Sequence, residues 1–200
     1  MSNQIISLFV LLFACTTLVQ AESVQTEPLQ GESTKLQGNI AVHIAKTHYL
    51  HPVRFLHPYL NVWQMQGPLA EQAAMASLKN SFTNINECAT DSEADVVLLL
   101  EPHIFYNAQL HVFHAEYIAR AYTNDITPIT RIKKQASEIG ALGIAPDFHV
   151  KNAYSKAIKK IIGKLANDQD FLATLNQNKP IKVGTLCNQL DNLPFDKLYY

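Results

Sequence analysis

Glycine is scarce in this 200-residue chain and basic residues are not in excess, and each shortage excludes a class of protein. Seven glycines and nine prolines without a repeating period exclude collagen-like and low-complexity chains. Sixteen Lys and Arg residues against seventeen Asp and Glu residues give a net charge of -1, so the basic excess typical of nucleic-acid-binding proteins is missing. The hydrophobic share of 48% excludes a wholly disordered chain and suffices for the core of one domain.

The common catalytic motifs are also missing. The sequence contains no Gly-x-Ser-x-Gly elbow, no His-Glu-x-x-His pair, no P-loop and no Gly-rich dinucleotide-binding turn. Glu101, Glu116 and His114 are candidates for an acid and a base, but the strand face of Glu116 and His114 is predicted to be a solvated polar face. We therefore predict a protein that is not an enzyme and binds no cofactor.

The uncharged run at residues 5–14 is shorter than the roughly 20 apolar residues of a transmembrane helix. Small residues follow it, and Val19-x-Ala21 fits a signal-peptidase site, so residues 1–21 are predicted to be a signal peptide and Glu22 the first mature residue. The alternative is a lipobox at residues 12–15, in which Cys15 becomes acylated, but the bulky Phe13 makes cleavage after Ala21 the preferred prediction. Both alternatives predict export to the periplasm, the second with an outer-membrane anchor.

A single folded domain is predicted for residues 38–177, after a polar flexible tether at 22–37. Apolar residues alternate over 40–44, which predicts a partly buried strand. The Pro-containing stretch 49–63 is predicted to be irregular or at a sheet edge. Gly67 and Pro68 open a predicted helix that ends near Phe82, and 84–93 is predicted to be a loop.

Three predicted strands follow and form an antiparallel meander. Residues 96–100 are apolar on both faces, as in a central strand, whereas the next strand alternates and the third, 129–138, is more polar. A final helix is predicted over 148–165, with Asp147 as its N-cap. The predicted class is α+β: a two-layer sandwich of order β-α-β-β-β-α with two helices on one face of the meander. Residues 178–200 are predicted to be an irregular tail.

The predicted final helix is amphipathic. Ile158 and Ile161 lie on its apolar arc, and four lysines lie opposite, namely Lys156, Lys159, Lys160 and Lys164. A solvated helix face is the preferred interpretation, and peripheral association with anionic lipid headgroups is the alternative.

Eight histidines raise the question of a metal site. Four of them are close in sequence: His43, His48, His51 and His57. Unpaired or hydrogen-bonded histidines are more common than metal ligands, and no Cys or carboxylate lies among these four. A His-dependent periplasmic or secreted metal-binding protein is therefore the alternative function.

The order of elements resembles a known family. The segments that carry this resemblance are the strand at 40–44, Trp63 shortly before Gly67-Pro68-Leu69-Ala70-Glu71, the strand ADVVLLLEPHIFYN at 94–107, the strand HVFHAEYIARAYT and the helix AYSKAIKKII. They are similar to auxiliary lipoproteins of bacterial ABC-type, MCE-associated lipid transport, and equally to other small envelope lipoproteins of related α/β fold. This resemblance implies a non-enzymatic module that docks on envelope transport or assembly machinery.

A partner is expected to bind either the exposed face of the sheet, which does not pack against the helices, or the sheet edge. The candidate contact residues on this face and its adjoining turn are Leu110, Val112, Ile118 and Tyr122. The sequence does not identify the envelope protein that binds there.

Two cysteines, Cys88 and Cys187, remain after removal of the signal peptide. Export places them where disulfides form and persist. A bridge would fasten the tail to the domain and contribute about 4 kcal/mol in the chain-entropy model. Two separately buried thiols are the alternative.

Overall fold

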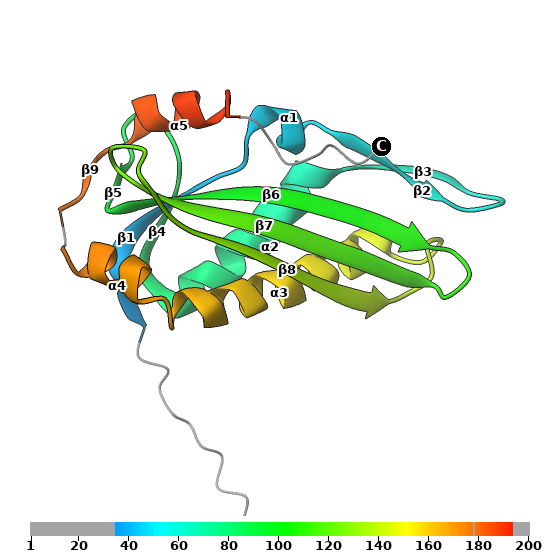
Figure 1. Ribbon diagram of the computed structural model, residues 1–200. Helices are drawn as coiled ribbons and strands as arrows, with labels where there is room; N and C mark the ends of the chain where they lie inside the picture. The colour runs from blue at the N-terminus through cyan, green and yellow to red at the C-terminus, as the bar shows by residue number, and fades with distance from the viewer. Residues whose placement is uncertain (1–34, 178, 194–200) are drawn as a thin grey trace, which may run out of the picture. The chain divides into compact units, whose positions relative to one another are not determined.

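A five-stranded mixed sheet lies at the centre of the fold in the computed structural model, which describes residues 35–177 and 179–193 (Figure 1). The strand order is β4-β1-β6-β7-β8. β1 runs parallel to both of its neighbours, whereas β6, β7 and β8 form an antiparallel meander. The α+β class and the meander predicted from the sequence are thus confirmed. The strands are β1 (Leu36–His43), β4 (Phe82–Glu87), β6 (Val96–Asn107), β7 (Val112–Thr123) and β8 (Pro128–Ile139).

The described residues belong to one compact unit, Ser33–Tyr200. The predicted signal peptide, the lipidation candidate Cys15 and most of the predicted tether lie outside the described residues.

Two long helices, α2 (Gln66–Ser81) and α3 (Pro146–Leu165), lie on one face of the sheet (Figure 1). The strand alternation explains this arrangement, because every second residue of β7 points toward the helices. Tyr117 of β7 is fully buried there, and its hydroxyl donates a hydrogen bond to the carbonyl of Ala70 in α2 at 2.7 Å. Ile158 of α3 is also fully buried in this main core.

A β-hairpin extends from the sheet beside the meander (Figure 1). It consists of β2 (Pro52–Leu56) and β3 (Asn61–Met65), and it follows the short helix α1 (Lys46–Tyr49). Phe55 anchors the hairpin, since its buried ring lies 5.6 Å from the ring of Phe113. The stretch 49–63, predicted as irregular or at an edge, is therefore largely a separate two-stranded sheet.

The C-terminal elements pack against the other face of the sheet. Helix α5 (Gly184–Leu190) follows the two-residue strand β9 (Ile181–Lys182), which pairs with β5 (Glu93–Ala94). The predicted irregular tail at 178–200 is thus ordered over these described elements. A second apolar cluster explains the difference, because it joins α5 to residues far away in sequence. Its buried members are Ala41, Ala45, Ala94, Val97, Leu99, Tyr122, Val183, Leu186, Cys187 and Leu190.

Several element boundaries differ from the prediction. The first part of the predicted loop at 84–93 belongs instead to strand β4, in which Phe82 and Ile85 are buried. The other residues of β4 are polar, so its sequence does not show the alternation of apolar residues that predicts a strand. Asp147 is not the N-cap of α3 but lies in its first turn, after Ala145 as N-cap and Pro146. Proline suits the first helical position because it lacks an N–H. The predicted element order also omitted the hairpin and β4. Helix α4 (Gln169–Asn176) contains Phe171, Leu172 and Leu175, whose spacing in the sequence indicates a further helical piece.

Lysines of α3 cover part of the outer edge of the sheet. Lys160 donates a hydrogen bond from its Nζ to the carbonyl of Gln135 in β8 at 2.8 Å, and Lys156 reaches the carbonyl of Ser137 at 3.4 Å. Charged side chains on an edge strand oppose strand addition by another chain. Among the described helices, none is long and apolar enough to cross a membrane.

Candidate functional site

Ionisable side chains gather on the sheet face that points away from α2 and α3. We call this set the charged face: Glu101, His103, Glu116, Arg120 and Lys133. Two ion pairs cross between neighbouring strands. Arg120 Nη2 lies 3.1 Å from Glu101 Oε1, and Lys133 Nζ lies 2.9 Å from Glu116 Oε1, while Gln135 also donates to Glu116.

Burial sets the electrostatics of the charged face. Glu101 has no exposed surface, and burial raises the pKa of its carboxyl, although Arg120 and Arg131 oppose this shift. A buried carboxylate is costly unless a cation pairs with it. The Arg120 guanidinium therefore has a structural role beside Glu101.

Two buried histidines lie beside these ion pairs. The rings of His48 and His103 meet edge to face, with centroids 5.5 Å apart. Burial, with His103, His51 and Arg120 nearby, lowers the pKa of His48 to about 4, and burial lowers the pKa of His103. Both imidazoles are therefore neutral at pH 7.

A hollow of about 530 Å³ lies where β6, β7 and β8 run side by side. Its volume is within the range of small-molecule sites. The ring of His114 stacks on Phe105 with centroids 4.5 Å apart, and His114 Nδ1 is hydrogen-bonded to Ser137 Oγ at 2.9 Å. The hollow can thus accept a group with both apolar and polar parts. Its wall is formed by His103, Ile104, Phe105, His114, Ala115, Glu116, Lys133, Gln135, Ala136, Ser137 and Lys160.

The residues that the sequence offers as acid and base candidates each form an ion pair or a hydrogen bond with a neighbouring side chain. Glu101 and Glu116 are held by Arg120 and Lys133 as above, and His114 is held by Ser137. The Ser137–His114 pair was not predicted, because it joins two strands whose register no local pattern reveals.

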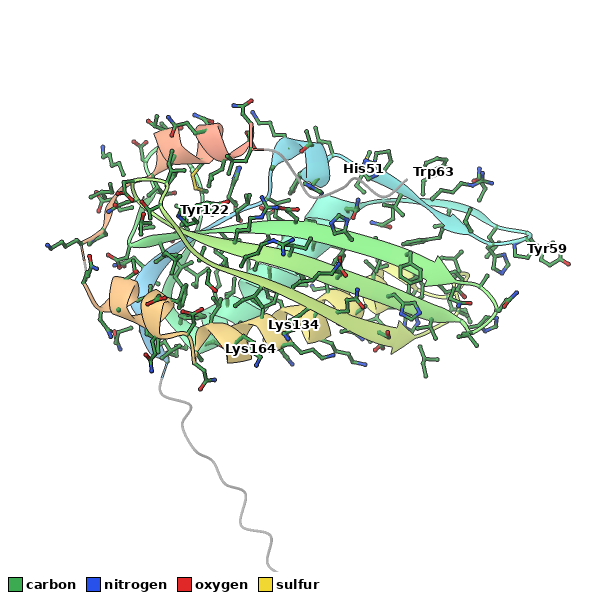
Figure 2. The ribbon with its side chains drawn as sticks, viewed as in Figure 1. His51, Tyr59, Trp63, Tyr122, Lys134 and Lys164 are labelled. Atoms are coloured by element: carbon green, nitrogen blue, oxygen red, sulfur yellow. A yellow bond between two sulfur atoms is a disulfide. The ribbon has the colours of Figure 1, made fainter. Side chains whose placement is uncertain are left out.

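The four predicted contact residues have different surroundings. Leu110, in the β6–β7 turn, is 67% exposed, and Val112 is half-buried. Ile118 and Tyr122 are buried, the latter in the second apolar cluster with α5 (Figure 2). A role for these four residues in binding stays a prediction, but only Leu110 offers a largely exposed side chain.

The four histidines proposed as metal ligands do not come together as one site: His51 lies near His48, whereas His43 and His57 have other partners. His43 Nε2 pairs with Asp191 Oδ1 at 2.9 Å, His48 is buried against His103, and His57 Nδ1 accepts hydrogen bonds from two backbone N–H groups in the hairpin turn. Within residues 35–177 and 179–193, no group of three His, Cys, Asp or Glu side chains is placed to hold a metal ion.

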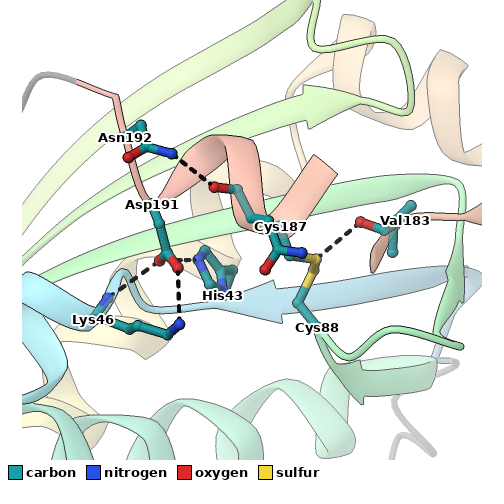
Figure 3. Close-up of polar contacts among 8 residues, drawn as sticks. His43, Lys46, Cys88, Val183, Cys187, Asp191 and Asn192 are labelled. Carbon is teal, nitrogen blue, oxygen red and sulfur yellow. Dashed lines mark hydrogen bonds and ion pairs between the residues drawn. A yellow bond between two sulfur atoms is a disulfide. The ribbon is translucent and has the colours of Figure 1, made fainter. Parts of the chain in front are cut away.

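Cys88 and Cys187 form a disulfide, as the sequence predicts (Figure 3). Their Cα atoms are 6.1 Å apart and their sequence separation is 99 residues. The bridge fastens α5 to the segment after β4, and Asp191 adds contacts to His43 and to the backbone N–H of Lys46 at 3.2 Å. The C-terminal elements are therefore held by covalent and polar contacts as well as by apolar packing.

Comparisons with known proteins assign no family. The sequence matches neither a protein-family model nor a curated protein. Among solved structures, the chain is similar to the crystal structure of a "putative lipoprotein" from Caulobacter crescentus CB15, with 17% identity and a TM-score of 0.36. The match covers 54% of this chain and 83% of that one. Because both the identity and the TM-score are low, this similarity assigns no function.

Proposed function

We propose that the protein is an exported, non-enzymatic binding module of the cell envelope. It docks on an envelope protein of transport or assembly machinery, with lipid transport as the class that the sequence resemblance suggests. Its partner is a protein, not a nucleic acid, and the module needs no cofactor. The disulfide between Cys88 and Cys187 supports this location, since such bridges persist in oxidising compartments.

The observation that carries the proposal is the hollow beside the charged face. In its wall Lys133 pairs with Glu116 across two strands, and Lys160 donates to the carbonyl of Gln135, so the wall is organised before a partner arrives. Its rim is accessible, because Lys133, Gln135 and Ser137 are exposed. A preorganised wall with an open rim suits recognition of a partner segment and lowers the entropic cost of binding.

Photo-crosslinking in intact cells tests the docking site. A photoreactive residue replaces Ser137 at the rim of the hollow, and in a matched control it replaces the exposed Lys164 on α3. We expect one envelope protein to be captured from position 137 but not from position 164. Lys133→Glu reverses the charge beside Glu116 and should abolish that adduct. Equal capture from both positions, or none from position 137, would contradict docking at the hollow.

The Ser137–His114 pair permits a direct test of the non-enzymatic part of the proposal. A serine beside a histidine is an arrangement that hydrolases use when a third group orients the base. A fluorophosphonate probe should leave Ser137 unlabelled in the folded protein. Labelling that is lost in both Ser137→Ala and His114→Ala would identify an activated serine and overturn the non-enzymatic assignment.

A further inference from the structure

Exposed apolar side chains are concentrated at the end of the sheet where the hairpin turn lies. Twelve large hydrophobic residues are exposed among the described residues, and only Ile181 lies outside three segments, 50–65, 105–110 and 139–148. Scattered exposed residues are normal, but such a concentration marks an interaction site. We define the apolar end by the seven members that lie in or next to the hairpin turn, the β6–β7 turn and the β8–α3 segment: Leu56, Tyr59, Leu60, Leu110, Ile139, Ile144 and Phe148.

The three segments of the apolar end meet in space. The N–H of Gly140 after β8 donates a hydrogen bond to the carbonyl of His111 in the β6–β7 turn at 2.8 Å. A Cβ on Gly143 would lie 3.7 Å from Leu60 Cδ1, which places the hairpin turn against the β8–α3 segment. Figure 1 shows the hairpin turn, the β6–β7 turn and the β8–α3 segment at one end of the sheet.

A cluster of aromatic side chains packs beside the apolar end. The ring of Phe113 lies 4.6 Å from Tyr106 and 5.7 Å from His149, and it also packs against Phe55. The Tyr106 hydroxyl accepts a hydrogen bond from the N–H of Leu142 at 3.3 Å. The segments that carry the exposed apolar side chains are therefore anchored to packed aromatic residues.

Charge is nearly missing from the same segments. Residues 50–65 and 105–112 contain no Asp or Glu, and Asp147 is the one carboxylate within 139–148. The hairpin carries Arg54 as its charged residue and two amphipathic aromatic side chains, Tyr59 and Trp63, which point away from the sheet in Figure 2. Tyr59 is 91% exposed and Trp63 56%.

We propose that the apolar end binds the interfacial zone of a phospholipid bilayer. Three neighbouring turns with protruding apolar side chains can enter between lipid headgroups without a partner of matching shape, and the scarcity of carboxylates avoids the desolvation of fixed charge. Tyrosine and tryptophan are enriched at the level of the headgroups in membrane proteins. The proposal rests on the envelope location proposed above, and it assigns lipid contact to the apolar end rather than to the lysines of α3.

Vesicle binding of the chain from Glu22 onward tests the proposal, with Trp63 as a built-in reporter because it is the single tryptophan. Vesicles of phosphatidylcholine alone, and of phosphatidylethanolamine with phosphatidylglycerol, should both shift the Trp63 emission to shorter wavelength. Lipids brominated near the headgroup end of the chain should quench it. Binding should persist at high salt, because apolar burial drives it.

Matched variants locate the contact. The double variant Tyr59→Asp, Ile144→Asp should weaken vesicle partitioning about tenfold or more, because each side chain loses apolar burial and adds a charge. Ile181→Asp, the same change at the remaining exposed residue, should leave partitioning unchanged. Thermal melts check that the variants are folded. The double variant should melt like the wild type, because Tyr59 and Ile144 are both exposed.

Three results would overturn the proposal. One is a Trp63 spectrum that vesicles do not change. The second is binding restricted to anionic vesicles, abolished by salt and by Lys159→Glu with Lys164→Glu, which would assign lipid contact to α3. The third is a concentration-dependent Trp63 shift without lipid, together with a dimer in sedimentation, which would identify a second copy of the chain as the occupant. None of these results affects crosslinking from Ser137, so failure here is distinguishable from failure of the proposed docking function.

Discussion

At the scale of single residues, His48 is the side chain whose protonation depends most clearly on folding. It is fully buried, and burial with His103, His51 and Arg120 nearby lowers its pKa from 6.5 to about 4. The unfolded chain therefore takes up a proton near pH 6.5, which the folded chain does not accept until about pH 4. His48 thus contributes stability that is complete above pH 6.5 and is lost as the pH falls toward 4.

His48→Gln should reduce this dependence on pH. Between about pH 7 and about pH 4.5, the wild type should lose about 2 kcal/mol more unfolding free energy than the variant, because the variant has no imidazole to protonate on unfolding. Urea denaturation at both pH values measures the difference. Equal slopes in the wild type and His48→Gln would contradict the assigned pKa.

At the scale of elements, helix α3 depends on its apolar face. Ile158 is fully buried in the main core, whereas the adjacent Lys159 is exposed. Ile158→Asp should lower the unfolding free energy by several kcal/mol out of a total of about 5–15, because it buries a charge without a partner. Lys159→Asp should cost little. Thermal melts compare the two variants, and equal destabilisation would show that α3 packs in another register.

Local periodicity predicted the elements whose burial alternates strongly. β7 and α3 show a clear period in sequence, because one face of each meets the main core. β4 was missed, since its six residues bury only Phe82 and Ile85 and its pairing with β1 is parallel and distant in sequence. Helix α5 was missed for a related reason: its buried residues contact a cluster built from β1, β6 and β7, which no local pattern reveals.

The candidate site could be predicted only in part. Alternation placed Glu116 and His114 on one face of β7, but it predicted a solvated face there. Glu116 is instead only 9% exposed and pairs with Lys133 of β8. The cross-strand register decides which charges meet, and that register follows from turns and packing rather than from either strand alone. The hollow and the Ser137–His114 pair required the folded structure for the same reason.

At the scale of the whole molecule, three features agree with an exported binding module. The sequence predicts a signal peptide, the disulfide joins the C-terminal elements to the sheet, and the hollow and the apolar end present two separate surfaces. The number of cysteines predicted the Cys88–Cys187 bridge, because removal of the signal peptide leaves two cysteines and therefore one possible intramolecular pair. Export is therefore the property on which the functional proposals depend.

The intact mass of the protein, purified unreduced from the cell envelope, tests export most directly. We predict a chain that begins at Glu22 and is lighter by two hydrogens than after reduction, because Cys88 and Cys187 are joined. A chain that begins at an acylated Cys15 would keep export and correct the cleavage site. A chain that retains residues 1–21, fractionates with the cytoplasm and carries thiols that react without prior reduction would contradict the exported, disulfide-bonded module.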